Sequence, residues 1–209
     1  MATANDIISK AFRMFDEETD SKYEQNGNRI TALEMLNDGC FEVCKETKCN
    51  RVIGTLTTVP GTREYDQPEG CVGIFSVECP NEQRFLPPTF YDSGNIRIGQ
   101  PGPINKYYLV ADKIGFDTIP NRIYNLNLIY FAGPTEDLEL DDEPTLIPAL
   151  WRNRILHYYL LWKLFAIDKR EEISARAPYW NGVYQSKLSE MREFYAGEAQ
   201  YAGELPELE

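Results

Sequence analysis

The sequence predicts an α+β protein in which a helical-bundle body carries an inserted antiparallel β domain. Apolar residues recur at three- and four-residue spacing before residue 48 and again after residue 148, as they do on amphipathic helices. Between residues 50 and 134 the pattern changes, because nine of the thirteen prolines and nine of the fourteen glycines lie there. These turn-forming residues alternate with short β-branched and aromatic runs, which is typical of short strands. Helical segments therefore flank a β region on both sides.

The order of these patterns divides the chain into parts with expected boundaries. Residues 1–49 supply the N-terminal helices of the body, and residues 50–135 form the inserted β domain. Residues 136–195 contain a C-terminal helix pair that completes the body. Residues 196–209 are acidic and contain glycine, so we expect a flexible tail that is disordered by itself.

Two helices are predicted in the first part, a short one over residues 5–15 and a second from about Thr31 to Thr47. The acidic stretch between them, residues 16–28, has no periodicity and is expected to be a surface loop. It does not match the calcium-loop pattern, so no metal site is expected there. Gly39 lies inside the second helix at a cost of ~1 kcal/mol relative to alanine, which indicates a close packing contact or a local irregularity.

The β region contains several short runs that favour strands, and they predict a small sandwich or a partly open barrel. The last run alternates Leu126, Leu128 and Tyr130 with Asn125, Asn127 and Ile129. That strand is expected to have one apolar face and one mixed face. The runs are Val52–Val59, Val72–Val77, Ile96–Ile98, Tyr107–Val110 and Ile123–Phe131.

The most apolar segment of the chain is the helix predicted from Leu150 to Phe165, followed by a last helix that begins near Pro178. The first of these helices has two apolar faces and therefore needs two sets of neighbours. One face carries Trp151, Ile155, Tyr158, Trp162 and Phe165, and the other carries Leu156, Leu160, Leu164 and Ile167.

Charge and hydropathy limit the classes of partner. The net charge of -12 argues against a protein that binds nucleic acid through its phosphates, although DNA that passes nearby without binding is compatible with it. Charged residues interrupt the best apolar run, so no membrane span is expected. Residues 1–6 lack the basic start and apolar core of a signal peptide, so export by that route is not expected either.

Residues that could carry catalysis or bind a metal are sparse, and we predict no catalytic, cofactor-binding or metal-binding residues. His157 is the only histidine and lies in an apolar helix, where a structural role is expected. The spacing of the five cysteines does not supply paired zinc ligands, and Cys40 and Cys44 are expected to be small buried residues. Phosphate-binding and serine-hydrolase motifs are absent from the sequence.

Several short motifs follow one another along most of the chain. Leu36-Asn37 falls in the second predicted helix, and the sequence PGTREYD at 60–66 leads into the β region. GQP at 99–101, YY at 107–108 and LNLIYFAGP at 126–134 come next, followed by residues 138–142, Ile147-Pro148 and the terminal helix pair. In this order the motifs resemble the head-to-tail adaptor, or connector, proteins of tailed bacteriophages, which form rings beneath the portal.

The resemblance implies a non-enzymatic structural protein of the virion neck, assembled in the host cytoplasm. Its implied partners are the portal protein, a tail or nozzle protein and further copies of itself in a closed ring, expected to be a dodecamer. Genomic DNA is expected to pass through the lumen without sequence-specific binding. One apolar face of the Trp151 helix is then expected to meet a ring neighbour. The residues expected to dock the tail onto the portal are Tyr195, Tyr201, Leu205 and Leu208.

Two other functions are compatible with the sequence. Asp and Glu are abundant enough for the carboxylate pair of a cell-wall hydrolase, but the sequence gives no means of choosing such a pair. A monomeric carbohydrate- or peptide-binding β module is the other alternative, and a deep aromatic cleft in the β region would favour it.

Overall fold

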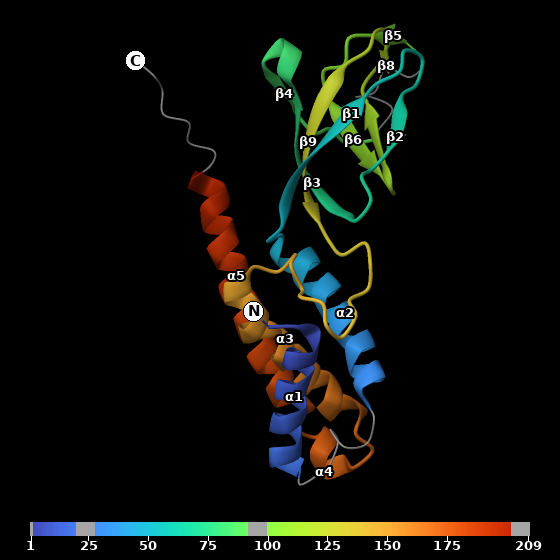
Figure 1. Cartoon of the computed structure of the whole chain (residues 1–209). Helices are drawn as coiled ribbons and strands as arrows, with labels where there is room; N and C mark the ends of the chain where they lie inside the picture. The colour runs from blue at the N-terminus through green and yellow to red at the C-terminus, as the bar shows by residue number, and fades with distance from the viewer. Residues whose placement is uncertain (1, 20–27, 92–99, 202–209) are drawn as a thin grey trace. The chain divides into compact units, whose positions relative to one another are not determined.

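The computed structural model describes residues 2–19, 28–91 and 100–201, without the side chains of residues 197–201. Contacts divide the chain into two compact units (Figure 1), one drawn from residues 1–50 and 133–209 and the other from residues 51–132. Helices form the first unit and strands the second, which confirms the predicted α+β class. The β unit therefore begins at Arg51 and ends at Ala132, against expected limits of 50 and 135.

The helical unit is built around α3, which contacts α1, α2 and α5 (Figure 1). Both apolar faces of α3 pack inside this unit, since Ile155 and Phe165 of one face and Leu156 and Leu160 of the other are fully buried. Most of both faces is therefore covered within the protomer, and a contact of one face with a ring neighbour stays a prediction that concerns only its less buried residues, such as Tyr158, Trp162 and Ile167. The helices are α1 Ala4–Thr19, α2 Arg29–Thr47, α3 Ala149–Ile167, α4 Glu171–Ser174 and α5 Ala177–Tyr201.

Two helices are longer than predicted. α1 begins at a reciprocal cap, in which the Thr3 N–H donates to the Asp6 carboxylate at 3.0 Å and the Asp6 N–H donates to the Thr3 hydroxyl at 3.2 Å. It continues to Thr19, so residues 16–19 are helical rather than part of a loop. The edge-to-face contact of Phe15 with Phe165, at 4.8 Å between ring centroids, holds this end of α1 in the core. α5 continues past Tyr195 to Tyr201.

The β unit contains a larger antiparallel sheet in the order β1-β9-β3-β4 and a smaller one in the order β2-β7-β6. β5 and β8 pair in parallel over two residues each, a detail that the antiparallel prediction missed. The strands are β1 Arg51–Thr57, β2 Glu64–Asp66, β3 Cys71–Cys79, β4 Arg84–Leu86, β5 Pro101–Gly102, β6 Tyr107–Val110, β7 Lys113–Phe116, β8 Ile119–Pro120 and β9 Asn125–Ala132.

The alternation predicted for the last strand is confirmed in β9. Leu126 and Leu128 are buried in the core of the β unit and Tyr130 packs against it, whereas Asn125 is exposed and Ile129 half-buried. The chain between β3 and β4 turns through a short 3-10 helix over Pro80–Glu82, and Gln83 closes that turn in a left-handed conformation with φ 49°. The predicted strand Ile96–Ile98 lies outside the described residues.

Candidate functional site

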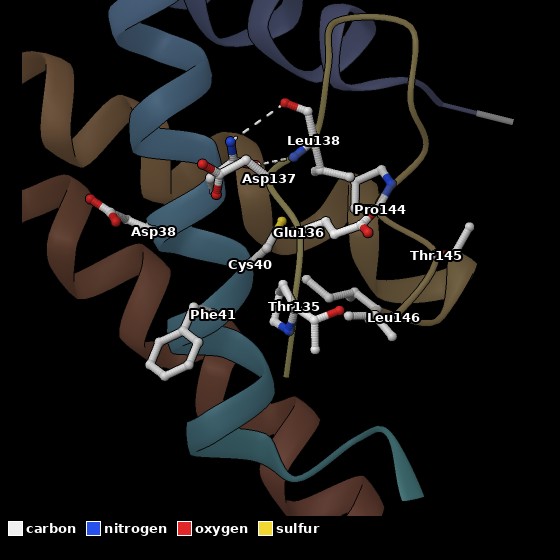
Figure 2. A pocket seen from close by; sticks show the side chains of 13 residues that line it. Asp38, Cys40, Phe41, Thr135, Glu136, Asp137, Leu138, Pro144, Thr145 and Leu146 are labelled. Atoms are coloured by element: carbon white, nitrogen blue, oxygen red, sulfur yellow. Dashed lines mark hydrogen bonds between the residues drawn. The ribbon is translucent and has the colours of Figure 1, made fainter. Parts of the chain in front are cut away.

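A groove in the helical unit is the best candidate for a binding site. It has a volume of about 400 Å³ and is lined by α2 on one side and by residues 134–138 and 144–147 on the other (Figure 2). These lining segments belong to the connection between β9 and α3, which has no helix or strand of its own. Contacts with α1, α2 and α3 hold this connection in place.

Asn37 on α2 fastens the first part of the connection. Its side-chain carbonyl accepts a hydrogen bond from the Leu138 N–H at 3.0 Å, and its side-chain amide donates to the Leu138 carbonyl at 3.5 Å. The dashed lines at Leu138 in Figure 2 mark these bonds. A single asparagine thus pairs with both backbone groups of one residue, as a neighbouring strand would. The pairing fixes the position of residues 135–138 against α2.

The N-terminus of α1 fastens the next part. The N–H groups of Ala4 and Asn5 donate to the carbonyls of Asp142 and Leu140 at 2.7 and 2.9 Å. The first N–H groups of a helix have no partner within the helix, so these bonds satisfy donors that otherwise need water. The Asp142 carboxylate in turn accepts from the Glu139 N–H at 2.8 Å, which closes a tight turn.

Arg152 on α3 holds the last part. Its guanidinium reaches back to the Ile147 carbonyl at 2.5 Å, the Thr145 carbonyl at 3.4 Å and the Glu143 carboxylate at 3.2 Å. The Arg152 side chain is only 10% exposed, so these bonds compensate its loss of hydration. Arg152 thereby links α3 to residues 143–147, most of which line the groove.

The groove combines an apolar floor with an acidic rim. Ile147 and Cys40 are buried at its base, and the ring of Phe41 is 47% exposed at its edge. Asp38, Glu136 and Asp137 line the rim and are exposed, and no lysine or arginine is found among the described lining residues. Such a groove suits a segment that carries an apolar side chain next to a positive charge.

The residues predicted to dock the tail lie at and beyond the end of α5. Tyr195 is half-buried against the helical core, and its ring contacts that of Phe194 edge-on at 5.1 Å between centroids. Tyr201 is the last residue of α5, and its side chain is not described. Leu205 and Leu208 lie outside the described residues. Of these four side chains only that of Tyr195 is described, and it does not line the groove.

His157 and the β unit offer weaker candidates. The His157 side chain is 2% exposed, and burial together with the nearby Lys10 charge lowers its pKa to about 4, so it is neutral at pH 7.

A hollow of about 170 Å³ in the β unit includes Glu82, Arg122 and Tyr124. Arg122 covers the Tyr124 ring at 4.9 Å and forms an ion pair with Glu82. This hollow is polar, unlike the aromatic cleft that a ligand-binding β module would need.

Metal and membrane sites are the remaining possibilities in the described part of the chain. No group of three or more histidine, cysteine, aspartate or glutamate side chains there is arranged to hold a metal ion. Within the same residues, no helix is long and apolar enough to span a bilayer. The groove on α2 consequently remains the main candidate.

Sequence reasoning did not find the groove. Asn37 and residues 138–142 stood out only as members of the motifs that resemble phage adaptors. Their role as a fastening appears once the fold brings α2 beside the connection. The signal available beforehand was the set of conformationally distinctive residues in an otherwise unpatterned segment, Pro134, Pro144 and Pro148, which indicates a fixed rather than a helical path.

Comparison with known proteins gives one further finding about the whole chain. The family model described as SU10 adaptor protein matches residues 2–204, which is nearly the full length and includes both units. A search of curated proteins finds no match.

Proposed function

This chain belongs to the SU10 adaptor protein family, and from that membership we propose that it forms a ring that joins the portal to the tail. The resemblance to phage head-to-tail adaptors is confirmed by the family match, and the family gives the chain a structural role in the neck of the virion. The match over residues 2–204 is the observation that carries the proposal. Ring closure, portal binding, the number of copies and assembly in the host cytoplasm are our proposals.

The charge of the chain supports a passive role toward DNA. A ring through which DNA is ejected must not bind the phosphates tightly. A net charge of -12 disfavours the phosphate contacts through which a protein displaces counterions from DNA. We propose that genomic DNA passes through the lumen of the ring without sequence-specific binding.

Three of the described carboxyl groups lack the property that a cell-wall hydrolase would require of its general acid. A glycosidase needs one carboxylic acid whose pKa is raised, so that it remains protonated. Asp6, Glu82 and Asp168 have pKa values below the usual range, because hydrogen bonds from Thr3, Arg84 and Arg170, respectively, stabilise their charged forms. These groups are therefore poor general acids.

The C-terminal end of the chain is proposed to dock on the portal. α5 carries the chain as far as Tyr201, and the sequence beyond it contains Leu205 and Leu208 among acidic residues. Together with Tyr195 and Tyr201, these leucines supply apolar anchors for binding to a groove on the portal. Removal of residues 202–209 is expected to weaken portal binding without unfolding the helical unit.

The acidic groove is proposed to receive a second contact, namely a basic segment with an apolar anchor from a neighbouring virion protein. The acidic tail of this chain is a poor occupant, because its charge has the same sign as the rim formed by Asp38, Glu136 and Asp137. Charge complementarity therefore favours a lysine- or arginine-bearing partner.

Charge reversal tests the groove. Asp38→Lys with Glu136→Lys reverses two rim charges, and phage that lack the wild-type protein are supplied with this variant. Glu34→Lys with Glu17→Lys is the matched control, because both positions are exposed and the net charge changes equally. We expect tailed particles, counted by electron microscopy, to fall at least tenfold for the groove variant and to stay near the wild-type number for the control. Equal numbers for the two variants would rule out the groove as a contact.

Immunogold labelling of whole virions tests the proposed place of the protein. Antibody against this chain should label particles at the junction between head and tail. Purified virions that contain no copy of the chain would contradict the proposed function, whatever the groove variants do.

A further inference from the structure

Strand β1 lies at one end of the larger sheet in the β unit, beside β9 (Figure 1). The pairing of β1 with β9 is antiparallel and keeps one register throughout, from Arg51 opposite Phe131 to Thr57 opposite Asn125. Among the described residues, no strand pairs with the other edge of β1. A free edge presents a row of backbone donors and acceptors to which a further strand can bind.

The register shows which backbone groups of β1 point away from β9. The Thr58 N–H donates to the Tyr124 carbonyl at 2.9 Å, and these two residues continue the register of the strand pair. Backbone groups alternate in direction along a strand, so every second residue before Thr58 faces β9 and the residues between them face outward. The N–H and C=O groups of Ile53, Thr55 and Thr57 therefore form the free edge. In the part of the chain that the structure describes, these groups have no hydrogen-bond partner.

β1 lacks the features that keep an edge strand from pairing with other chains. Such features are lysine or proline on the edge, a bulge, or a very short strand. β1 has seven residues in an unbroken register, and after Arg51 it contains no charge and no proline. Ile53 is 68% exposed and lies opposite the half-buried Ile129 of β9, so the exposed face at this edge is partly apolar. Edge and face together suit an extended, uncharged segment.

The other strand edges of the β unit are shorter, charged or already paired. β4 has three residues, and the chain that follows it pairs with β6. There the Tyr107 N–H donates to the Pro87 carbonyl at 3.2 Å, and the Thr89 N–H donates to the Tyr107 carbonyl at 2.7 Å. β2 also has three residues, and Glu64 and Asp66 carry charge along it. Within the described strands, β1 therefore offers the one long neutral edge.

We propose that an extended, uncharged strand from a different protein of the neck pairs with the free edge of β1. This inference rests on the proposed ring, in which one rotation relates successive copies and each contact joins two different surfaces. β1 could pair with β1 of another copy only across a two-fold axis between them, and neighbouring copies in such a ring are not related in that way. The C-terminal segment of another copy is a poor occupant, since its glutamates would lie along a neutral edge and Pro206 has no N–H. A strand from another neck protein meets neither objection.

Electron cryo-microscopy of the neck of intact virions tests the proposal directly. We expect a fifth strand beside the four-stranded sheet, about 4.8 Å from β1 and with the side chains of another protein. The inference is overturned if the β1 edge faces solvent in the virion, or if the added strand comes from another copy of this chain. Both results leave the proposed function intact, whereas a neck without this chain contradicts the proposed function itself.

Substitution of Thr55 separates the backbone edge from the side-chain surface. Thr55→Pro removes an outward N–H and places a ring at the edge, but it removes no hydrogen bond to β9, so the chain is expected to fold. Thr55→Val is the matched control, because it changes the same side chain and keeps the backbone donor. In phage that lack the wild-type protein, we expect tailed particles to fall at least tenfold for Thr55→Pro and to stay near the wild-type number for Thr55→Val. Equal numbers for the two folded variants would overturn the inference.

Hydrogen exchange of the purified wild-type chain provides a measurement that needs no variant, should Thr55→Pro fail to fold. The amides of Ile53, Thr55 and Thr57 should exchange roughly tenfold or more faster than those of Gly54 and Leu56, which are bonded to β9. Exchange rates that do not alternate along β1 would show that its edge is covered in the free chain, and the inference would fail.

Discussion

Gly39 on α2 lies against the ring of Tyr159 on α3, and this contact explains a glycine inside a helix. A Cβ built at Gly39 meets the Tyr159 ring at 2.6 Å, which is closer than carbon atoms can approach. Of the two explanations compatible with the sequence, the close packing contact is correct. Glycine lowers the helix propensity at this position, but because it has no Cβ it allows α2 to approach α3 closely.

Gly39→Ala should therefore destabilise the protein despite the better helix propensity of alanine. We expect a loss of about 1–3 kcal/mol in the free energy of unfolding, because the Tyr159 ring must move within a filled core. Gly182→Ala on α5 is the control, since no atom lies within 4 Å of its added Cβ, and this change should gain up to ~1 kcal/mol. Urea unfolding measures both. A gain in both variants would contradict the packing contact.

His157 should make stability depend on pH. Its pKa is about 4 in the folded chain and about 6.5 when unfolded, so only the unfolded chain takes up a proton between these values. The free energy of unfolding should consequently be unaffected by His157 above pH 6.5 and fall as the pH drops toward 4, by ~3 kcal/mol at most. His157→Phe should flatten this fall relative to the wild type in urea unfolding at a series of pH values. Parallel curves would contradict the buried, neutral state of His157.

Arg152 should matter far more than Arg154, although the two lie on the same helix. Arg152→Met leaves the Glu143 carboxylate and the carbonyls of Thr145 and Ile147 without their donor, and we expect a loss of ~2 kcal/mol or more. Arg154→Met removes an exposed charge and should change the stability by less than ~0.5 kcal/mol. Thermal unfolding distinguishes the two. In addition, proteolysis within residues 134–147 should accelerate only for Arg152→Met.

At the scale of elements, α3 shows what its apolar pattern did and did not determine. The two faces predicted around Trp151 and Leu160 exist, and both are largely covered by α1, α2 and α5 of the same chain, although Ile167 is 47% exposed. The sequence established that the helix needs neighbours on both sides. It could not say whether those neighbours belong to the same chain, because burial against a protomer's own helices and burial in an assembly require the same apolar residues.

Substitutions on the two faces should accordingly have the same effect. Leu160→Ala and Trp151→Ala should each lower the free energy of unfolding by about 2–5 kcal/mol. Leu150→Ala, at a position that is 55% exposed, should change it little and serves as the control on the same helix. Chemical denaturation provides the measurement. If Trp151→Ala left the stability intact and abolished only oligomer formation, its face would belong to an interface between copies after all.

The helices and strands could largely be predicted from the sequence, whereas the groove could not. The helices and most strands were predictable, because a repeat of three to four residues or of two residues is a local property of the sequence. The extension of α1 was missed because polar residues 16–19 hid the contribution of Phe15 to the core. The groove was missed because it depends on Asn37, Arg152 and the α1 N-terminus converging on a segment with no periodicity.

At the scale of the whole molecule, one family model matches both the helical unit and the β unit, so both are expected to take part in the same assembly. The helical unit carries the acidic groove and the end of α5, two of the surfaces that we propose for partners. Because most of α3 is buried within the protomer, we expect the contacts of the proposed ring to lie mainly on other surfaces. The proposed ring would then assemble from prefolded protomers, and a stable monomer in solution is compatible with it.

Electron microscopy of the purified chain mixed with purified portal rings tests the central proposal most directly. We predict a closed ring of this protein bound at one end of the portal, with the chain present at the neck of intact virions. The proposal is contradicted if the chain stays monomeric both alone and with portal rings and no copy of it is found in virions.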